Sequence, residues 1–129
     1  DLADVLDPAQ ARSSATVRVV VIGGGGCGLT AALAAHQAGA EVLVLERDPS
    51  TLGTTAMSTG LIPAAGTRQQ RERGIEDSPE RFARDIVAKA RGQTDERMAL
   101  ALARESARTV EWLVDDHAVP LSLVDSFLY

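Results

Sequence analysis

The stretch VRVVVIGGGGCG, residues 17–28, decides the fold. A β-branched apolar run, broken only by Arg18, ends in consecutive glycines. Such a run is typical of a buried parallel strand. An alanine- and leucine-rich segment follows, and Gly39 stands where the glycine after a helix is expected. A second apolar run, EVLVLE over 41–46, completes a βαβ unit, which predicts an α/β fold.

The glycines follow the spacing Gly23-x-Gly25-x-x-Gly28 at the junction of strand and helix. In a dinucleotide fingerprint, the first permits the tight turn, the second lets a pyrophosphate approach the backbone, and the third lets helix and strand pack closely. The helix N-terminus offers free N–H groups to phosphates. Glu46 ends the second strand, where a carboxylate can accept hydrogen bonds from ribose hydroxyls and disfavours a 2′-phosphate. The pattern predicts an adenine-dinucleotide site and leaves FAD and NAD open.

The remaining sequence predicts a long loop and two helices. Residues 47–67 are rich in Thr, Ser and Gly and show no period, which indicates a long loop that is either functional or disordered. The charged stretch 69–77 is interpreted as a solvated connection. Helix-start signals predict helices over 77–91 and 95–116. A short final strand is left open after them.

Composition excludes several classes of function. The net charge is −5 and the estimated pI is 4.9, which argues against nucleic acid and anionic membrane surfaces as partners. No apolar run is long enough for a membrane span. The single cysteine, Cys27, excludes an internal disulfide and favours a cytoplasmic location. Residues 1–16 are expected to form a flexible leader. The missing initial methionine and the apolar ending LVDSFLY predict a piece of a longer polypeptide.

Several side chains have an alternative, structural interpretation. Cys27 is interpreted as a small packing residue within the fingerprint. His36 and His117 are interpreted as surface or helix-end residues, and neither has metal-ligand spacing around it. A solvated face is expected for three arginines, Arg68, Arg71 and Arg73. None of these residues is assigned a catalytic or metal-binding role.

The run 17–67 resembles the N-terminal FAD-binding segment of a flavoprotein superfamily. That superfamily contains fumarate reductases, succinate dehydrogenase flavoprotein subunits and 3-ketosteroid Δ1-dehydrogenases. The stretches AAGTRQQRERGIEDSPERFARDI (64–86) and DERMALALARESARTVEWL (95–113) are similar to the soluble flavocytochrome-type fumarate reductases, whereas TTAMS (54–58) is closer to the ketosteroid branch. The resemblance covers about residues 17–119. It implies a partial Rossmann-like fold of the glutathione-reductase type, followed by two helices and truncated from a larger flavoprotein.

The resemblance also implies FAD as the cofactor and assigns residues to its parts. Glu46 would hold the adenosine ribose, with Arg47 beside it. Thr54 stands where membrane-complex members carry a histidine covalently attached to FAD, so noncovalent FAD is expected. Leu52 and Leu61 replace glycines of the family pattern, so the loop geometry can differ there. The pyrophosphate would lie along Gly23, Gly25, Gly26, Cys27 and Gly28, and the flavin end would be lined by Gly53, Thr54, Thr55, Thr59 and Gly60.

The resemblance implies an FAD-dependent oxidoreductase that makes or reduces a C=C bond of a small-molecule substrate by hydride transfer through flavin N5. In this family, the substrate-facing acid, arginine and histidine groups come from a capping domain and a C-terminal half that these 129 residues lack. The chain itself is therefore expected to be inactive and to self-associate through an exposed sheet edge. Two alternatives stay open: an adenine-dinucleotide-binding module without redox activity, and an inactive proteolytic fragment.

Overall fold

The computed structural model describes residues 16–51 and 53–124 of the chain. The chain divides into two compact units, residues 1–60 and 61–129, which are described separately. Apart from Thr16, the leader predicted over 1–16 lies outside the described residues. Leu52, one of the two departures from the family pattern, and the end of the apolar stretch LVDSFLY, residues 125–129, also lie outside them.

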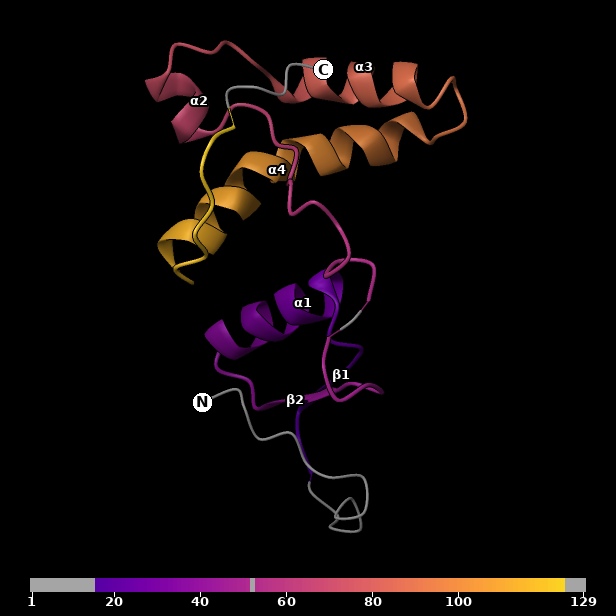
Figure 1. Cartoon of the computed structure of the whole chain (residues 1–129), viewed down its shortest axis with the longest axis vertical. Coiled ribbons are helices and arrows are strands. Elements are labelled where there is room, and N and C mark those ends of the chain that lie inside the picture. Colours follow the sequence, from indigo (N-terminus) through magenta and orange to yellow (C-terminus); the bar gives the residue numbers. More distant parts are fainter. Residues whose placement is uncertain (1–15, 52, 125–129) are drawn as a thin grey trace. The chain divides into compact units, whose positions relative to one another are not determined.

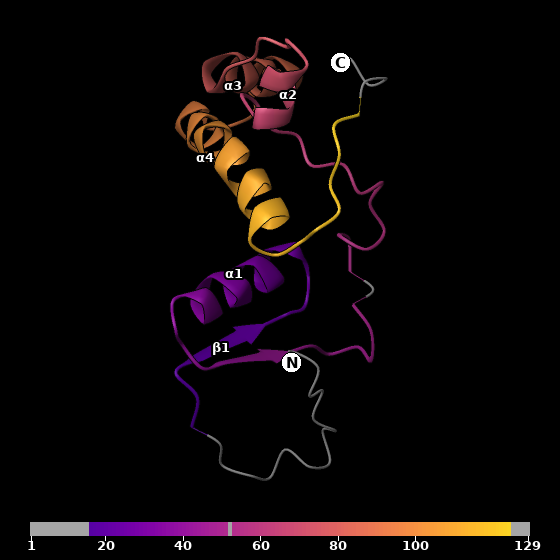
Figure 2. The ribbon, with the colours of Figure 1, turned by 90° about the vertical axis from the view of Figure 1, so that its left-hand side faces the viewer.

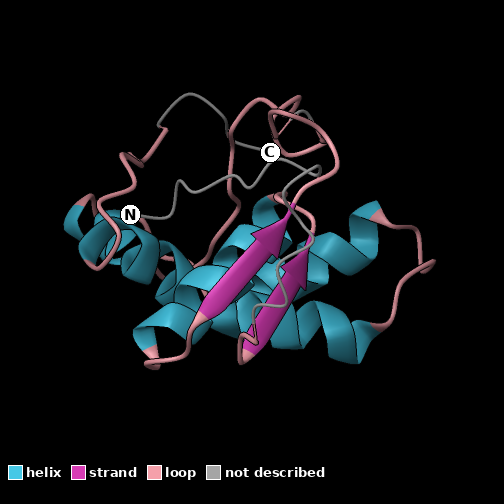
Figure 3. Cartoon of the chain, turned by 90° about the horizontal axis from the view of Figure 1, so that it is seen from below, coloured by secondary structure: helices cyan, strands magenta, loops and turns pink. Residues whose placement is uncertain are grey.

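The first unit is the predicted βαβ arrangement. Strand β1 (Val19–Ile22) leads to helix α1 (Gly26–Gln37), and strand β2 (Val42–Leu45) follows (Figure 1). The two strands are parallel, with Val19 opposite Val42 and Ile22 opposite Leu45, and Figure 3 shows them side by side. Ala38 is the C-cap residue of helix α1, and Gly39 follows it with a φ of +82°. The α/β class expected from the sequence is therefore confirmed.

Helix α1 covers one face of this sheet, as Figure 2 shows. Ala32, near the middle of the helix, is only 2% exposed. Successive strand residues point to opposite faces, so Val20 and Ile22 lie on the other face, where they are 49% and 86% exposed. The described sheet has two strands, so each strand has one edge without a described neighbour.

The second unit is a helical hairpin preceded by a short helix. The elements are α2 (Arg68–Glu72), α3 (Pro79–Lys89) and α4 (Glu96–Asp115). The predicted start signals act as helix caps: the Ser78 hydroxyl accepts the N–H of Arg81, and the Asp95 carboxylate accepts the N–H of Arg97. Helices α3 and α4 pack against each other through their apolar faces. Their buried apolar residues are all alanines, Ala83, Ala99 and Ala103, which leave little side chain between the two helices.

Helix α2 was not predicted, because the charged stretch 69–77 was interpreted as a solvated connection. Thr67 and Gln70 form a reciprocal capping box and are both buried. The guanidinium of Arg68 donates to both carboxylate oxygens of Asp115, at 2.8 and 3.0 Å. Arg68 thus stays on the solvated face expected for the arginines, and there it links α2 to the end of α4 through this exposed ion pair.

Further contacts fix the segment in front of α2. The N–H of Ala65 donates to the buried hydroxyl of Ser106 at 3.1 Å, and that hydroxyl donates to the carbonyl of Ala103. Arg71 donates to the Gly66 carbonyl and approaches Glu111 at 3.7 Å. The region around residues 64–72 is thus held on α4 by polar contacts.

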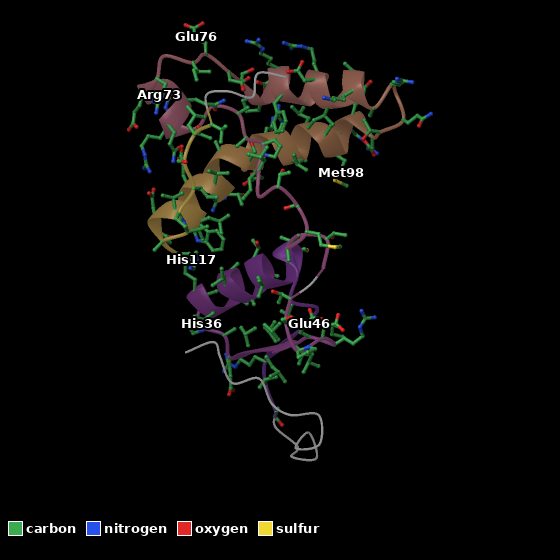
Figure 4. All side chains as sticks on the ribbon, viewed as in Figure 1. His36, Glu46, Arg73, Glu76, Met98 and His117 are labelled. Carbon is green, nitrogen blue, oxygen red and sulfur yellow. The ribbon has the colours of Figure 1, made fainter. Side chains whose placement is uncertain are left out.

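Two apolar side chains of α4 lie outside this packing. Met98 and Leu102 are 68% and 56% exposed, and Figure 4 shows Met98 pointing away from α3. The residues described after α4, up to 124, form no strand, so the final strand left open by the sequence does not occur there. None of the described helices combines the length and apolarity needed to cross a bilayer.

Candidate cofactor-binding site

The glycine turn between β1 and α1 has the geometry that the fingerprint requires. Gly23 leaves the strand with a φ of +103°, a conformation that residues with a side chain rarely adopt. A Cβ atom on Gly28 would overlap the carbonyl oxygen of Gly23 and lie 3.2 Å from Cγ1 of Val21. Helix α1 can therefore approach β1 this closely only because position 28 carries no side chain.

The start of α1 presents backbone amides toward the glycine turn. Gly25 occupies the N-cap position, so the helix has no side-chain cap from that residue. The N–H of Gly26 donates to the hydroxyl of Thr55 at 3.0 Å. Within the described residues, the N–H groups of Gly25, Cys27 and Gly28 have no protein acceptor. Free amides at a helix N-terminus form a favourable environment for phosphate oxygens.

Glu46, labelled in Figure 4, follows β2 directly, and its side chain reaches the glycine turn. Its Oε2 accepts the N–H of Gly24 at 2.6 Å, and its Oε1 accepts the N–H of Asp48 at 3.2 Å. These bonds, first the one from Gly24 and then the one from Asp48, lower the pKa of the Glu46 carboxyl below its ordinary value. Glu46 is exposed, so its ionised oxygens keep lone pairs that can accept further hydrogen bonds.

The loop residues expected at the flavin end do not all lie in the same environment. Residues 53–58 form a tight turn in which the N–H groups of Ala56 and Met57 donate to the Gly53 carbonyl. Thr55 in this turn contacts the start of α1. Thr54, Thr59 and Gly60 are exposed. Within the described part of the chain, none of these three residues bonds to the glycine turn.

Two further predicted site residues face solvent. Arg47 is 90% exposed and pairs with the neighbouring Asp48 at 3.2 Å. Cys27, the second residue of α1, is exposed as well. The interpretation of Cys27 as a packing residue was therefore wrong: its side chain lies on the outer side of the helix start, where a ligand or a reagent can reach it.

Gly24 and Thr51 also shape the glycine turn, although the sequence pattern did not identify either of them. Gly24 is the buried glycine whose N–H binds Glu46. A Cβ on Gly24 would lie 2.8 Å from Cγ2 of Thr51 and 3.1 Å from Oε2 of Glu46. The fingerprint treats position 24 as variable, and only the unbroken run of glycines hinted that it is constrained too.

The described residues hold no group of three or more His, Cys, Asp or Glu side chains that could bind a metal ion. His36 lies at the exposed end of α1. His117 follows α4 and packs edge-on against Trp112, with ring centroids 4.3 Å apart (Figure 4). Both histidines are thus helix-end residues, as expected.

Comparison with known proteins agrees with this geometry. Residues 18–125 match a family described as "FAD binding domain". A probable fumarate reductase of Shewanella frigidimarina is 40% identical over 103 residues, which make up 80% of this chain and 18% of that protein. The open conformation of a flavocytochrome c3 fumarate reductase superposes with a TM-score of 0.71 at 36% identity, over 88% of this chain and 21% of the other.

A second solved structure is also similar. It is a 3-ketosteroid-Δ4-(5α)-dehydrogenase from Rhodococcus jostii RHA1 in complex with 4-androstene-3,17-dione, with a TM-score of 0.73 and 37% identity over 82% of this chain and 22% of the other. The chain thus spans about a fifth of the relatives that it matches.

Fold and site together define a dinucleotide-binding βαβ unit of the flavoprotein class. The chain belongs to the FAD binding domain family. The superfamily that the sequence resembles is confirmed, and FAD is the adenine dinucleotide that the turn alone left undecided. The glycine turn, the free amides of α1 and the acid after β2 fit the pyrophosphate and ribose of this cofactor.

Proposed function

We propose that this chain is the FAD-binding segment of an oxidoreductase that makes or reduces a C=C bond. The observation that carries the proposal is the start of α1, where free amides meet a glycine turn that Glu46 closes from the end of β2. A family match over 18–125 supports it.

Each residue of the turn has a distinct task in this proposal. The amides of Gly25, Cys27 and Gly28 receive the pyrophosphate oxygens. The Glu46 carboxylate accepts the ribose hydroxyls and is kept ionised by the hydrogen bonds from Gly24 and Asp48. Bound FAD supplies the N5 atom that gives or takes a hydride. Thr54, Thr59 and Gly60 stay assigned to the flavin end, with Arg47 beside the ribose.

The names of the relatives guide the proposed substrate class. Fumarate and 4-androstene-3,17-dione both carry a C=C bond beside an electron-withdrawing carbonyl group. We infer that the substrate is a small molecule of this kind. We also propose that the 129-residue chain alone turns over no substrate, since it spans only about a fifth of the relatives that it matches.

A direct test uses the visible spectrum and the single cysteine. The purified chain is incubated with FAD and desalted, and the flavin absorbance that it retains is measured. Cys27 is the only cysteine in the chain and is exposed, so its alkylation by iodoacetamide reports on the glycine turn. FAD is expected to slow this alkylation in a saturable manner, because the pyrophosphate covers the start of α1.

Two controls make the result specific. Riboflavin, which lacks the pyrophosphate, is expected to leave the alkylation rate unchanged. In urea, where the turn is lost, FAD is expected to have no effect. A colourless desalted chain whose Cys27 is alkylated at the same rate with and without FAD would overturn the proposal.

Three expectations stay predictions. Noncovalent attachment predicts that acid precipitation releases all of the flavin. The edges of β1 and β2 without described neighbours predict self-association of the isolated chain, which sedimentation at increasing concentration tests. A cytoplasmic location, without nucleic acid or membrane partners, is predicted from the acidic composition and the single cysteine.

A further inference from the structure

We propose that Thr55 belongs to the pyrophosphate end of the site, where it caps α1 from a distance and offers its hydroxyl proton to a phosphate oxygen. This inference rests on the proposed function. It differs from the expectation that the resemblance produced, in which Thr55 lines the flavin together with its neighbours.

Thr55 caps the start of α1. Gly26 is the first residue of α1, and its N–H has no side-chain acceptor from the N-cap residue, Gly25. Thr55 supplies the missing acceptor from 29 residues further along the chain, at 3.0 Å. A threonine hydroxyl that accepts the N–H at a helix start does the work of an N-cap, although here it comes from another segment.

The loop that carries Thr55 approaches the glycine turn very closely. A Cβ on Gly26 would lie 3.2 Å from Oγ1 and 3.3 Å from Cγ2 of Thr55. The Thr55 side chain therefore sits directly against the backbone of the glycine turn. Since Gly26 lacks a side chain, it lets the hydroxyl reach the amide.

The hydroxyl of Thr55 can donate a hydrogen bond as well as accept one. A threonine hydroxyl has one proton to donate in addition to the lone pairs with which it accepts. The Oγ1 of Thr55 accepts from Gly26, but its own proton has no acceptor within the described residues. Thr55 is exposed, so a ligand at the free amides of α1 can reach this proton. A phosphate oxygen is a strong acceptor for it.

The turn around Thr55 fixes the position of its side chain. The Thr55 carbonyl accepts the hydroxyl of Ser58 at 2.8 Å, and the Gly53 carbonyl accepts two N–H groups of the same turn. Thr55 thus couples the loop to the phosphate-binding turn and acts as a positioning residue as well as a ligand.

The test compares Thr55→Val, which keeps the shape and removes the hydroxyl, with Thr55→Ser, which keeps the hydroxyl. ADP carries the adenosine and the pyrophosphate without the flavin, so it separates the two ends of the site. Affinities for ADP and FAD are measured by titration calorimetry on the full chain. Thr55→Val is expected to weaken the binding of both ligands by the same factor, about tenfold or more. Thr55→Ser is expected to restore both.

A second readout needs no ligand. In the ligand-free chain, the Gly26 amide is expected to exchange with solvent faster in Thr55→Val than in the wild type and in Thr55→Ser. Ser50→Ala serves as the matched control, because Ser50 is an exposed hydroxyl residue of the same segment; it is expected to change neither readout.

The possible failures are distinguishable. A loss in Thr55→Val that affects FAD and leaves ADP unchanged would return Thr55 to the flavin end and overturn the inference. Equal Gly26 exchange in the wild type and Thr55→Val would also overturn it. A wild-type chain that binds neither ADP nor FAD would overturn the proposed function, and this inference would fall with it.

Discussion

The α-carbon of Gly28 faces the carbonyl oxygen of Gly23 with no room for a methyl group between them. This relationship joins the first turn of α1 to the end of β1. It makes position 28 the most restrictive in the glycine turn, because the obstacle is backbone and cannot rotate away.

The substitution Gly28→Ala is therefore expected to displace α1 from the strand. We expect FAD retention to be lost and the chain to be destabilised by about 1–3 kcal/mol, the usual range for overpacking. Urea unfolding and the flavin spectrum after desalting measure the two effects. Ala34→Ser, which adds one atom at an exposed position of the same helix, is the matched control and is expected to change little. Normal FAD retention by Gly28→Ala would contradict the geometry.

The Glu46 carboxyl is expected to titrate below its ordinary pKa of about 4.3. The cause is the hydrogen bond from the Gly24 amide, followed by the bond from Asp48. Because the folded pKa is lower than the unfolded one, Glu46 contributes to stability above the unfolded pKa. This contribution is lost as the pH falls through the folded pKa. A carbon-detected NMR titration of the side chain, in buffer and in urea, measures both values. A folded midpoint at or above the urea midpoint would refute the prediction, and Glu46→Gln is expected to remove this part of the pH dependence.

The buried hydroxyl of Ser106 accepts the N–H of Ala65. Ser106→Ala would leave that amide buried without an acceptor, which costs about 1–3 kcal/mol of unfolding free energy. Urea unfolding followed by circular dichroism measures the loss. Ser122→Ala removes an exposed hydroxyl from the same unit and is expected to have no measurable effect. Equal stability of the two variants would mean that the Ala65 contact contributes nothing.

Ala103 is fully buried in the helical hairpin, whereas Ala101, two residues earlier on α4, is exposed. Ala103→Leu is expected to destabilise the chain by about 1–3 kcal/mol through overpacking. Ala101→Leu makes the same chemical change on the solvent side and is expected to be nearly neutral. Thermal unfolding measures the stability of both variants. If Ala103→Leu is as stable as Ala101→Leu, the buried alanines do not limit the approach of the two helices.

Signals that lie within a few residues of each other predicted most of the fold. The apolar runs around Val20 and Val44, the glycine spacing, and the caps at Ser78 and Asp95 act locally, so the sequence reveals them directly. The acid Glu46 could also be found, because its distance from the fingerprint is characteristic of dinucleotide sites.

Features that depend on distant partners could not be predicted in the same way. Helix α2 is fastened by Arg68 and Asp115, which are 47 residues apart, so its charged sequence suggested an exposed connection. Thr55 was grouped with the flavin loop, because nothing near it in the sequence indicates that it meets Gly26. Cys27 was interpreted as a packing residue, since the small size required by the motif does not reveal which way the side chain points.

The glycine turn also constrains the order in which the chain folds. Four consecutive glycines provide no side chain for their own amides, and the acceptors for Gly24 and Gly26 come from 22 and 29 residues downstream. Closing loops of this length costs conformational entropy before any contact compensates for it. The cofactor turn is therefore completed only after β2 and the following loop have formed. During synthesis, the ribosome must release the chain beyond Thr55 before the turn that begins at Gly23 can close.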